Sequence, residues 1–292
     1  VLSASLATWT AVLAAVHQRD AVHAMTGVDV ALMGLATVLA FALLGLIEDL
    51  FSVSVRARLV LQLVLGAGLG LMAHSAFEVS LWWTPAICVG TAALVNATNF
   101  MDGANGLACG HALLTSLWYV QVAAVAPVAG LGLVMVSVAG ACLGFLPFNT
   151  PRAKVFLGDS GSYALGSAWA FAVTAGLSRG VAVEAALAPV LVLLADTGYT
   201  LWMRLRAGQC WYAPHRLHVY QRLVCAGWPH WASALLVTLA AAACSTLAAG
   251  SLLTSNRLWM PQLAMAAVLI LYLKMPSIIG APNPFPTLRR AR

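Results

Sequence analysis

The chain has 292 residues, of which 62% are hydrophobic and only 8% are charged, and its mean hydropathy is +0.90. A soluble domain carries about 25% charged residues and cannot bury this much apolar surface, so the composition excludes a soluble enzyme, a disordered chain and a nucleic-acid-binding module. The net charge of +6 is therefore no sign of a nucleic-acid partner, and the composition predicts an all-α, polytopic transmembrane helical bundle.

Ten segments are apolar enough to cross about 30 Å of hydrocarbon as helices. In chain order they cover residues 1–16, which is short, and then 28–47, 58–73, 81–98, 106–126, 128–147, 161–177, 184–203, 231–252 and 259–278. The longest polar stretch covers about 204–230. We find no repeat and no soluble domain, so we predict a single integral membrane domain over residues 1–292.

Positive charge is divided unequally between alternate loops. Twelve of the fifteen Lys and Arg residues fall in one set of loops or beside it, namely Arg56, Arg58, Arg152, Lys154, Arg204, Arg206, Arg216, Arg222, Lys274, Arg289, Arg290 and Arg292. The other set holds Arg19, Arg179 and Arg257. The positive-inside rule therefore places the first set, and with ten spans both termini, in the cytoplasm.

Five of the nine acidic residues lie toward that same predicted membrane face. Glu48, Asp49, Asp102 and Asp159 lie at span ends or in cytoplasmic loops, and Asp196 lies inside a span, in its cytoplasmic half. An ionised carboxylate in hydrocarbon costs at least about 2.5–3.5 kcal/mol, so such residues are rare without a function. Carboxylates that converge from separate segments suggest a divalent cation, although each one alone could be an interfacial end charge.

The segment Asn96-Ala97-Thr98-Asn99-Phe100-Met101-Asp102-Gly103 carries a polar stripe at the end of a span. Asn96 and Asn99 are three residues apart and share one helical face, which Asp102 extends. Amides beside a carboxylate suit recognition of a sugar or a base, while the alternative is a helix end capped by Asn and Gly.

The segment Val155-Phe156-Leu157-Gly158-Asp159-Ser160-Gly161-Ser162 precedes another span. A Gly, Asp and Ser loop before a helix presents free N–H groups to an anion, and Asp159 is a candidate metal ligand. A simple N-cap without a ligand is an equally good interpretation of this segment alone.

The longest polar stretch contains His215-Arg216-Leu217-His218-Val219-Tyr220-Gln221-Arg222-Leu223. So many donors in nine residues suit phosphate oxygens, with Arg offering bidentate contacts. The alternative is an ordinary basic cytoplasmic loop. Two His residues three apart, without further Cys or His partners, argue against a zinc site.

With these three blocks and the acidic pair followed by Arg58 and Gln62, the sequence resembles the polyprenyl-phosphate N-acetylhexosamine-1-phosphate transferase family over essentially its whole length. The resemblance implies a magnesium-dependent membrane enzyme, with manganese as an alternative ion. Such an enzyme moves a sugar 1-phosphate from a UDP-N-acetylhexosamine to undecaprenyl phosphate and releases UMP. The basic block is similar to the branch that initiates O-antigen and related polysaccharides on the bacterial inner membrane, with the active site facing the cytoplasm and a homodimer as an option.

The resemblance also implies roles for individual residues. Glu48 and Asp49 would handle the lipid phosphate, Asp159 and Asp102 would bind the metal, and all four would form the catalytic set. The substrate-binding set would be Asn96, Asn99, Asp196, His215, Arg216 and His218. We expect a direct single displacement, because a phosphate monoester is already largely ionised at neutral pH and needs no strong base. Covalent catalysis by Glu48 or Asp49 is the alternative.

Three departures from the family pattern leave other functions open. Glu48 stands where an Asp is usual, Asn105 stands where an Asp is often found, and the family's first span and the Arg/Gly-rich segment after it are expected to be missing before Val1. A catalytically impaired family member is therefore one alternative. A separate alternative is an ion-coupled transporter, in which the acidic residues of the membrane segments would serve ion coupling, although the polar residues collect at one face and no internal repeat is visible.

Overall fold

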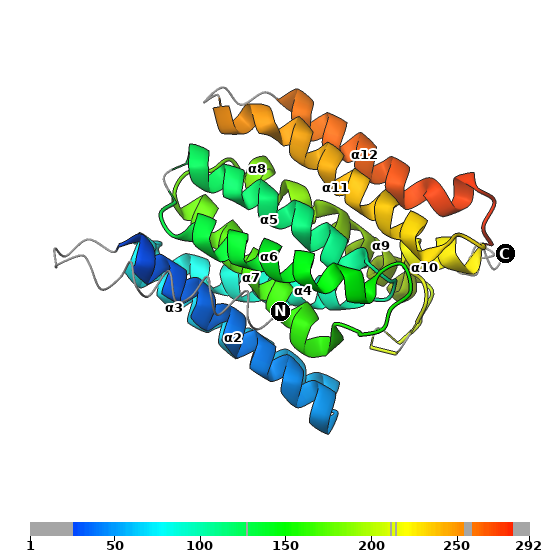
Figure 1. Ribbon diagram of the computed structural model, residues 1–292, viewed down its shortest axis with the longest axis horizontal. Coiled ribbons are helices and arrows are strands. Elements are labelled where there is room, and N and C mark those ends of the chain that lie inside the picture. Colours follow the sequence, from blue (N-terminus) through cyan, green and yellow to red (C-terminus); the bar gives the residue numbers. More distant parts are fainter. Residues whose placement is uncertain (1–25, 127, 211, 214, 254–258, 283–292) are drawn as a thin grey trace.

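The computed structural model describes residues 26–126, 128–210, 212–213, 215–253 and 259–282. The described chain is helical, and its α-helices lie alongside one another as a bundle (Figure 1). They are α2 (Gly27–Phe51), α3 (Val55–Phe77), α4 (Thr84–Phe100), α5 (Leu107–Val125), α6 (Leu131–Asn149), α7 (Gly158–Ser178), α8 (Val183–Leu187), α9 (Leu191–Arg206), α10 (Val219–Cys225), α11 (His230–Leu253) and α12 (Trp259–Ile278).

The prediction of an all-α membrane bundle is confirmed, and the count of about ten spans is approximate. Among the described residues, seven helices are long and apolar enough to cross a membrane. The segment predicted at 1–16 lies outside the described residues, and each of the other nine predicted spans coincides with a helix or a helix pair. Two of these nine are not among the seven: α4, which has only 17 residues, and α7, which is long enough but less apolar. The span predicted at 184–203 is broken into α8 and α9 by a 3-10 turn that contains Pro189.

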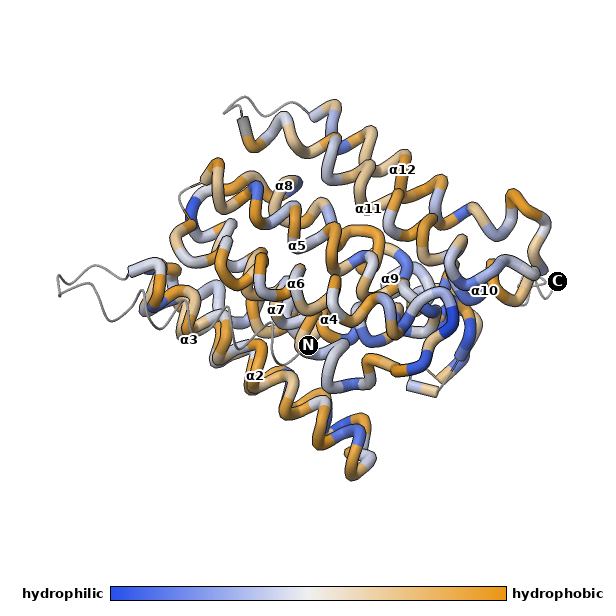
Figure 2. The backbone as a smooth tube through the Cα atoms, viewed as in Figure 1, coloured by the Kyte–Doolittle hydropathy of each residue, from blue (hydrophilic) through white to orange (hydrophobic). Residues whose placement is uncertain are grey.

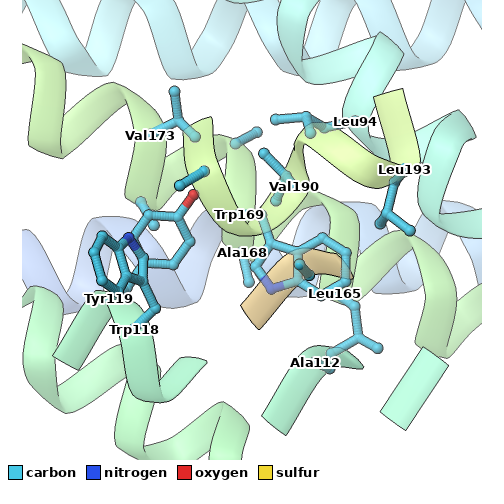
Figure 3. Packing of buried hydrophobic residues seen from close by; sticks show 14 of the residues in the cluster. Leu94, Ala112, Trp118, Tyr119, Leu165, Ala168, Trp169, Val173, Val190 and Leu193 are labelled. Carbon is cyan, nitrogen blue, oxygen red and sulfur yellow. The ribbon is translucent and has the colours of Figure 1, made fainter. Parts of the chain in front are cut away.

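The central helix is α7, which packs between α2 and α4 and is buried at every position from Leu165 to Gly176. α7 fills the centre with Trp169 and Phe171, and its buried Ser167 hydroxyl donates to the Ala164 carbonyl oxygen of the same helix at 2.9 Å. Figure 3 shows Trp169 of α7 among Leu165, Ala168 and side chains of neighbouring helices. Packing in the core therefore fixes the position of α7 from Leu165 to Gly176.

Two glycines allow α7 to approach its neighbours closely. A Cβ atom on Gly45 of α2 would lie 2.3 Å from the carbonyl oxygen of Asp159, and one on Gly166 of α7 would lie 2.6 Å from the Cα atom of Val95 in α4. Such distances are possible only where a glycine faces the neighbouring backbone. The N-terminus of α7 is therefore held directly against α2.

The polar residues gather at one end of the bundle, which we call the polar end (Figure 2). Because the long helices alternate in direction, α2, α4 and α9 finish at this end, whereas α3, α5 and α7 begin there. The loop between α6 and α7 and the segment before α10 lie at the same end. The predicted carboxylates at the end of α2, just after α4 and at the start of α7 are thus brought to one end of the molecule.

Candidate functional site

Asp49 binds the first backbone amides of α7. Its Oδ1 accepts a hydrogen bond from the Asp159 amide and its Oδ2 accepts one from the Ser160 amide, both at 3.0 Å. The first N–H groups of a helix have no partner within the helix, and a carboxylate also interacts favourably with the positive end of the helix dipole. Asp49 therefore caps α7 from a different helix and fixes the position of Asp159.

Asn99 joins the end of α4 to the same helix terminus. Its Nδ2 donates to Oδ1 of Asp159 at 2.6 Å and to Oγ of Ser162 at 3.0 Å. The predicted polar stripe of α4 thus faces α7, and one Asp159 oxygen is held by an amide donor. Asn96, one turn earlier, donates to Oε1 of Gln62 in α3 at 2.5 Å and to its own helix at Ala92.

Glu48 forms an ion pair across the turn between α2 and α3. Its Oε1 lies 3.1 Å from Nη1 of Arg58, and the two side chains are 13% and 19% exposed. The other carboxylate oxygen, Oε2, is buried and makes no hydrogen bond within the described chain. The longer Glu side chain therefore serves to hold Arg58 at the polar end.

Asp102 lies in the short loop between α4 and α5, beside Asp159. Burial, and after it the negative charge of Asp159, raise the pKa of the Asp102 carboxyl to about 7. Two carboxylates whose charges interact repel each other when both are ionised, and a cation bound by both would remove that repulsion.

A cavity of about 660 Å³ opens beside these residues between α3, α4, α9 and α10. We call it the site cavity. Its polar lining comes from Arg58, Gln62, Asn96, Asn99, Asp102, Thr197, His215, His218 and Tyr220, among others. Glu48, Asp49 and Asp159 are not among its lining residues, but Arg58 and Asn99 connect them to it.

Two polar atoms on opposite walls of the site cavity have no hydrogen-bond partner within the described chain. They are Nε2 of Gln62, whose side chain is fully buried in α3, and Oγ1 of Thr197 in α9. A buried donor without a partner costs about 1–3 kcal/mol, so such atoms call for a water, an ion or a ligand. These two atoms are therefore available to form hydrogen bonds with a polar group bound in the cavity.

The basic segment divides into buried and exposed residues. His218 is buried and His215 half-buried, and both line the site cavity, whereas Arg216 is exposed and is not among the lining residues. Burial, and after it the neighbouring His218, lower the pKa of His215 to about 4, so its ring is neutral at pH 7. His215 can therefore offer a phosphate one N–H group but no positive charge.

Asp196 is fully buried, so it does not face the site cavity as a free carboxylate. Its oxygens lie near Nδ1 of His218 at 3.1 Å and the hydroxyl of Tyr272 at 2.7 Å. Sequence reasoning named Gln62 only as part of the motif that follows the acidic pair and gave it no role, and it did not select Tyr272 or Thr197. The signal that could have found Thr197 is its place directly after Asp196, as a second polar residue inside a span.

The donor set suits a magnesium ion better than a metal held by protein alone. Among the residues that the structure describes, no group of three or more His, Cys, Asp or Glu side chains could hold a metal ion. Magnesium typically takes one or two carboxylates and completes its shell with water and substrate phosphates. Asp102 and Asp159, coupled through their charges, provide such a pair.

A second pocket, of about 720 Å³, lies farther along the bundle between α4, α7 and α8. We call it the distal pocket. Its lining is mostly apolar and includes Trp83, Ile87 and Leu177. Ala93 and Leu194 line both the site cavity and the distal pocket, so the two spaces are neighbours along α4 and α9.

Residues 31–177, half of the chain, match the model of glycosyl transferase family 4. The chain belongs to this family. The matched region contains Asp49, Asp102 and Asp159, so the family match covers the carboxylates at the polar end.

Named relatives agree with this membership of family 4. The chain is 36% identical over 172 residues to decaprenyl-phosphate N-acetylglucosaminephosphotransferase of Mycolicibacterium smegmatis. This aligned region covers 51% of the chain and 42% of the relative. It is 29% identical over 211 residues to a Bacillus subtilis protein named probable undecaprenyl-phosphate N-acetylglucosaminyl 1-phosphate transferase, and the aligned region covers 67% of the chain and 59% of the relative. It is 33% identical over 165 residues to phospho-N-acetylmuramoyl-pentapeptide-transferase of Desulforamulus reducens, and the aligned region covers 47% of the chain and 48% of the relative. The chain thus matches about half the length of these relatives.

Proposed function

We propose that the protein transfers an N-acetylhexosamine 1-phosphate from a UDP-sugar to undecaprenyl phosphate and releases UMP. The observation that carries this proposal is the convergence of Asp49, Asp102 and Asp159, from three separate segments, beside a cavity lined by Arg58 and His218. Family 4 membership and the relatives' names, which refer to polyprenyl phosphates and N-acetylglucosamine, support the same class of reaction.

The reaction brings two phosphorylated substrates together, so its main difficulty is negative charge. Arg58, at the cavity wall, offers bidentate hydrogen bonds to a phosphate, and the free Gln62 amide lies one helical turn away on the same face of α3. Asp102 and Asp159 would hold a magnesium ion, which supplies charge neutralisation for the phosphates when it is bound. Together these groups would stabilise the charge on departing UMP.

The hydrogen bonds of the acidic pair favour direct displacement over covalent catalysis. Both oxygens of Asp49 accept backbone amides of α7, and Oε1 of Glu48 is paired with Arg58. A nucleophilic Asp49 would have to leave its two amide partners before attack, and the oxygen of Glu48 without a hydrogen bond within the described chain, Oε2, is buried on a residue that does not line the site cavity. The lipid phosphate is already largely ionised at neutral pH, so it can attack the sugar diphosphate itself.

The apolar surroundings of the site cavity support a lipid acceptor. Ala93 and Leu194 border both the site cavity and the apolar distal pocket, so an isoprenoid chain that reached the distal pocket would leave its phosphate at the polar end. Asp49, Asp102 and Asp159 lie near the ends of their spans at the polar end rather than at mid-depth, which argues against an ion-coupled transporter.

Several finer features stay predictions from the sequence. They are a cytoplasmic orientation of the polar end in a bacterial inner membrane, a homodimer, and O-antigen or lipopolysaccharide as the destination of the sugar. None of the three relatives' names mentions an O-antigen. An N-acetylglucosamine donor is the one that two of the names favour.

The test is UMP release by the purified protein in bilayers that contain undecaprenyl phosphate. UDP-N-acetylglucosamine, UDP-N-acetylgalactosamine and UDP-N-acetylmuramoyl-pentapeptide are supplied separately with Mg²⁺, and lipid-linked product is followed by mass spectrometry. We expect release with one donor only, dependent on the lipid, and nearly abolished by Asp159→Asn. Asp29→Asn, at the opposite end of α2, is the matched control. Absence of UMP with all three donors, from protein that remains folded, would favour the catalytically impaired alternative.

A further inference from the structure

We propose that Asp196 is a positioning residue, which fixes the imidazole of His218 in the wall of the site cavity. This inference rests on the proposed function for its consequence in turnover, but the contacts that carry it are independent of the substrate. They join three helices, α9, α10 and α12, at one fully buried carboxylate.

Four groups surround the Asp196 carboxylate. Oδ1 accepts from the hydroxyl of Thr200 at 3.2 Å and lies 3.1 Å from Nδ1 of His218, whereas Oδ2 accepts from the Val219 amide at 3.0 Å and from the hydroxyl of Tyr272 at 2.7 Å. An ionised carboxylate only accepts hydrogen bonds, so it requires a hydrogen on Nδ1 of His218. The other ring nitrogen, Nε2, is then the one left for the site cavity.

The ring of His218 is also confined on its faces. Its centroid lies 6.0 Å from that of Phe100, with an angle of 26° between the planes, and 6.2 Å from that of Tyr220, with an angle of 11°. The hydroxyl of Tyr220 in turn donates to the carbonyl oxygen of Phe100 at 3.0 Å. Stacking restricts the tilt of the ring, and Asp196 selects its rotation and its tautomer.

A carboxylate suits this position better than an amide. The Val219 amide can act only as a donor, and His218 is held as a donor at Nδ1, so two of the four neighbours cannot accept a hydrogen bond. An Asn at position 196 would place an NH₂ donor among neighbours that donate hydrogen bonds to the Asp196 carboxylate. Its single oxygen would have to serve both the ring and the backbone of α10, and the tautomer of His218 would no longer be fixed by charge.

The simpler interpretation is that Asp196 only stabilises the fold by joining α9, α10 and α12. The two interpretations differ in a double-mutant cycle measured on folded protein. A residue that acts through His218 has little left to contribute once His218 is changed, whereas a purely structural residue lowers turnover by the same factor in both backgrounds.

The first experiment measures kcat and KM for UMP release by Asp196→Asn, His218→Asn and the double variant. We expect Asp196→Asn to lower kcat about 10- to 100-fold, as loss of a group that orients a functional His typically does. Added to His218→Asn, it should lower kcat by less than about threefold. Tyr119→Phe removes a buried hydrogen bond to the Ala186 carbonyl, 2.7 Å long and outside the site cavity, and serves as the matched control for loss of stability alone.

The second experiment needs no activity. Solid-state ¹⁵N NMR of histidine-labelled protein in bilayers, with His218→Asn to assign the signal, reports which nitrogen of His218 carries the hydrogen. We expect Nδ1 to be protonated in the unaltered protein, and a shift toward the Nε2–H tautomer in Asp196→Asn. If the unaltered protein releases no UMP, the proposed function fails while this spectrum still tests the positioning role. Equal tautomers in both proteins, or additive losses of kcat in the cycle, would overturn the inference.

Discussion

Replacement of Gly45 by Ala tests whether the contact between α2 and α7 builds the site. The new Cβ atom would lie 2.3 Å from the Asp159 carbonyl oxygen and 2.6 Å from the Cα atom of Ser160, whereas ordinary contact begins near 3.4 Å. Both neighbours are backbone, so the helices must separate by about 1 Å. Overpacking of this kind costs about 1–3 kcal/mol of stability. A displacement of 1 Å at reacting groups can cost about 100-fold in rate.

The assay is UMP release per folded molecule, together with thermal unfolding of the protein in the same bilayers. We expect Gly45→Ala to lower turnover about 100-fold and to lower the melting temperature. Gly140→Ala in α6 is the matched control, because a Cβ atom there meets nothing within 4 Å and alanine is the better helix former. If Gly45→Ala and Gly140→Ala behaved alike in both measurements, the close approach of α2 to α7 would have no part in building the site.

Three further predictions concern the loops and the metal. Asn105 donates through Nδ2 to the Pro151 carbonyl oxygen at 3.2 Å. Because a carboxylate cannot donate, Asn105→Asp should lower the stability of the protein by about 1–2 kcal/mol. An unchanged melting temperature at pH 7 would contradict this. The pKa of His215 is about 6.5 in the unfolded protein and about 4 in the folded protein. Between these pH values the unfolded state binds more protons, so the stability of the protein should fall as the pH is lowered from 6.5 to 4. His215→Gln should reduce that fall in melting temperature, and equal pH profiles would count against it. EDTA should stop UMP release and excess Mg²⁺ should restore it, whereas turnover that continues in EDTA would remove Asp102 and Asp159 from the proposed metal site.

The sequence was sufficient to predict the bundle and the end at which the carboxylates meet. Helix direction alternates with each span, so the positions of Asp49, Asp102 and Asp159 relative to the span ends place them together without any knowledge of packing. Apolar run length also located α2 and α11 to within a few residues, because burial in lipid or core requires such runs whichever helices are neighbours.

The contacts within the site could not be predicted in the same way. That Asp49 would cap α7 depends on the close approach at Gly45, a contact between residues more than a hundred positions apart. The partners of Asp196 lie 22 and 76 residues away along the chain, and only the packing of α9 against α12 brings Tyr272 to it. Local sequence carries no record of such pairings.

The two side chains shared by the site cavity and the distal pocket impose a shape on any inhibitor that extends from one space into the other. Such a molecule needs a hydrogen-bonding head to engage Arg58 and Gln62, and a slender flexible tail at the level of Ala93 and Leu194. A larger residue in place of Ala93, which borders both spaces, is therefore expected to weaken binding of lipid-like compounds that reach the distal pocket more than that of nucleotide-like compounds that stay in the site cavity.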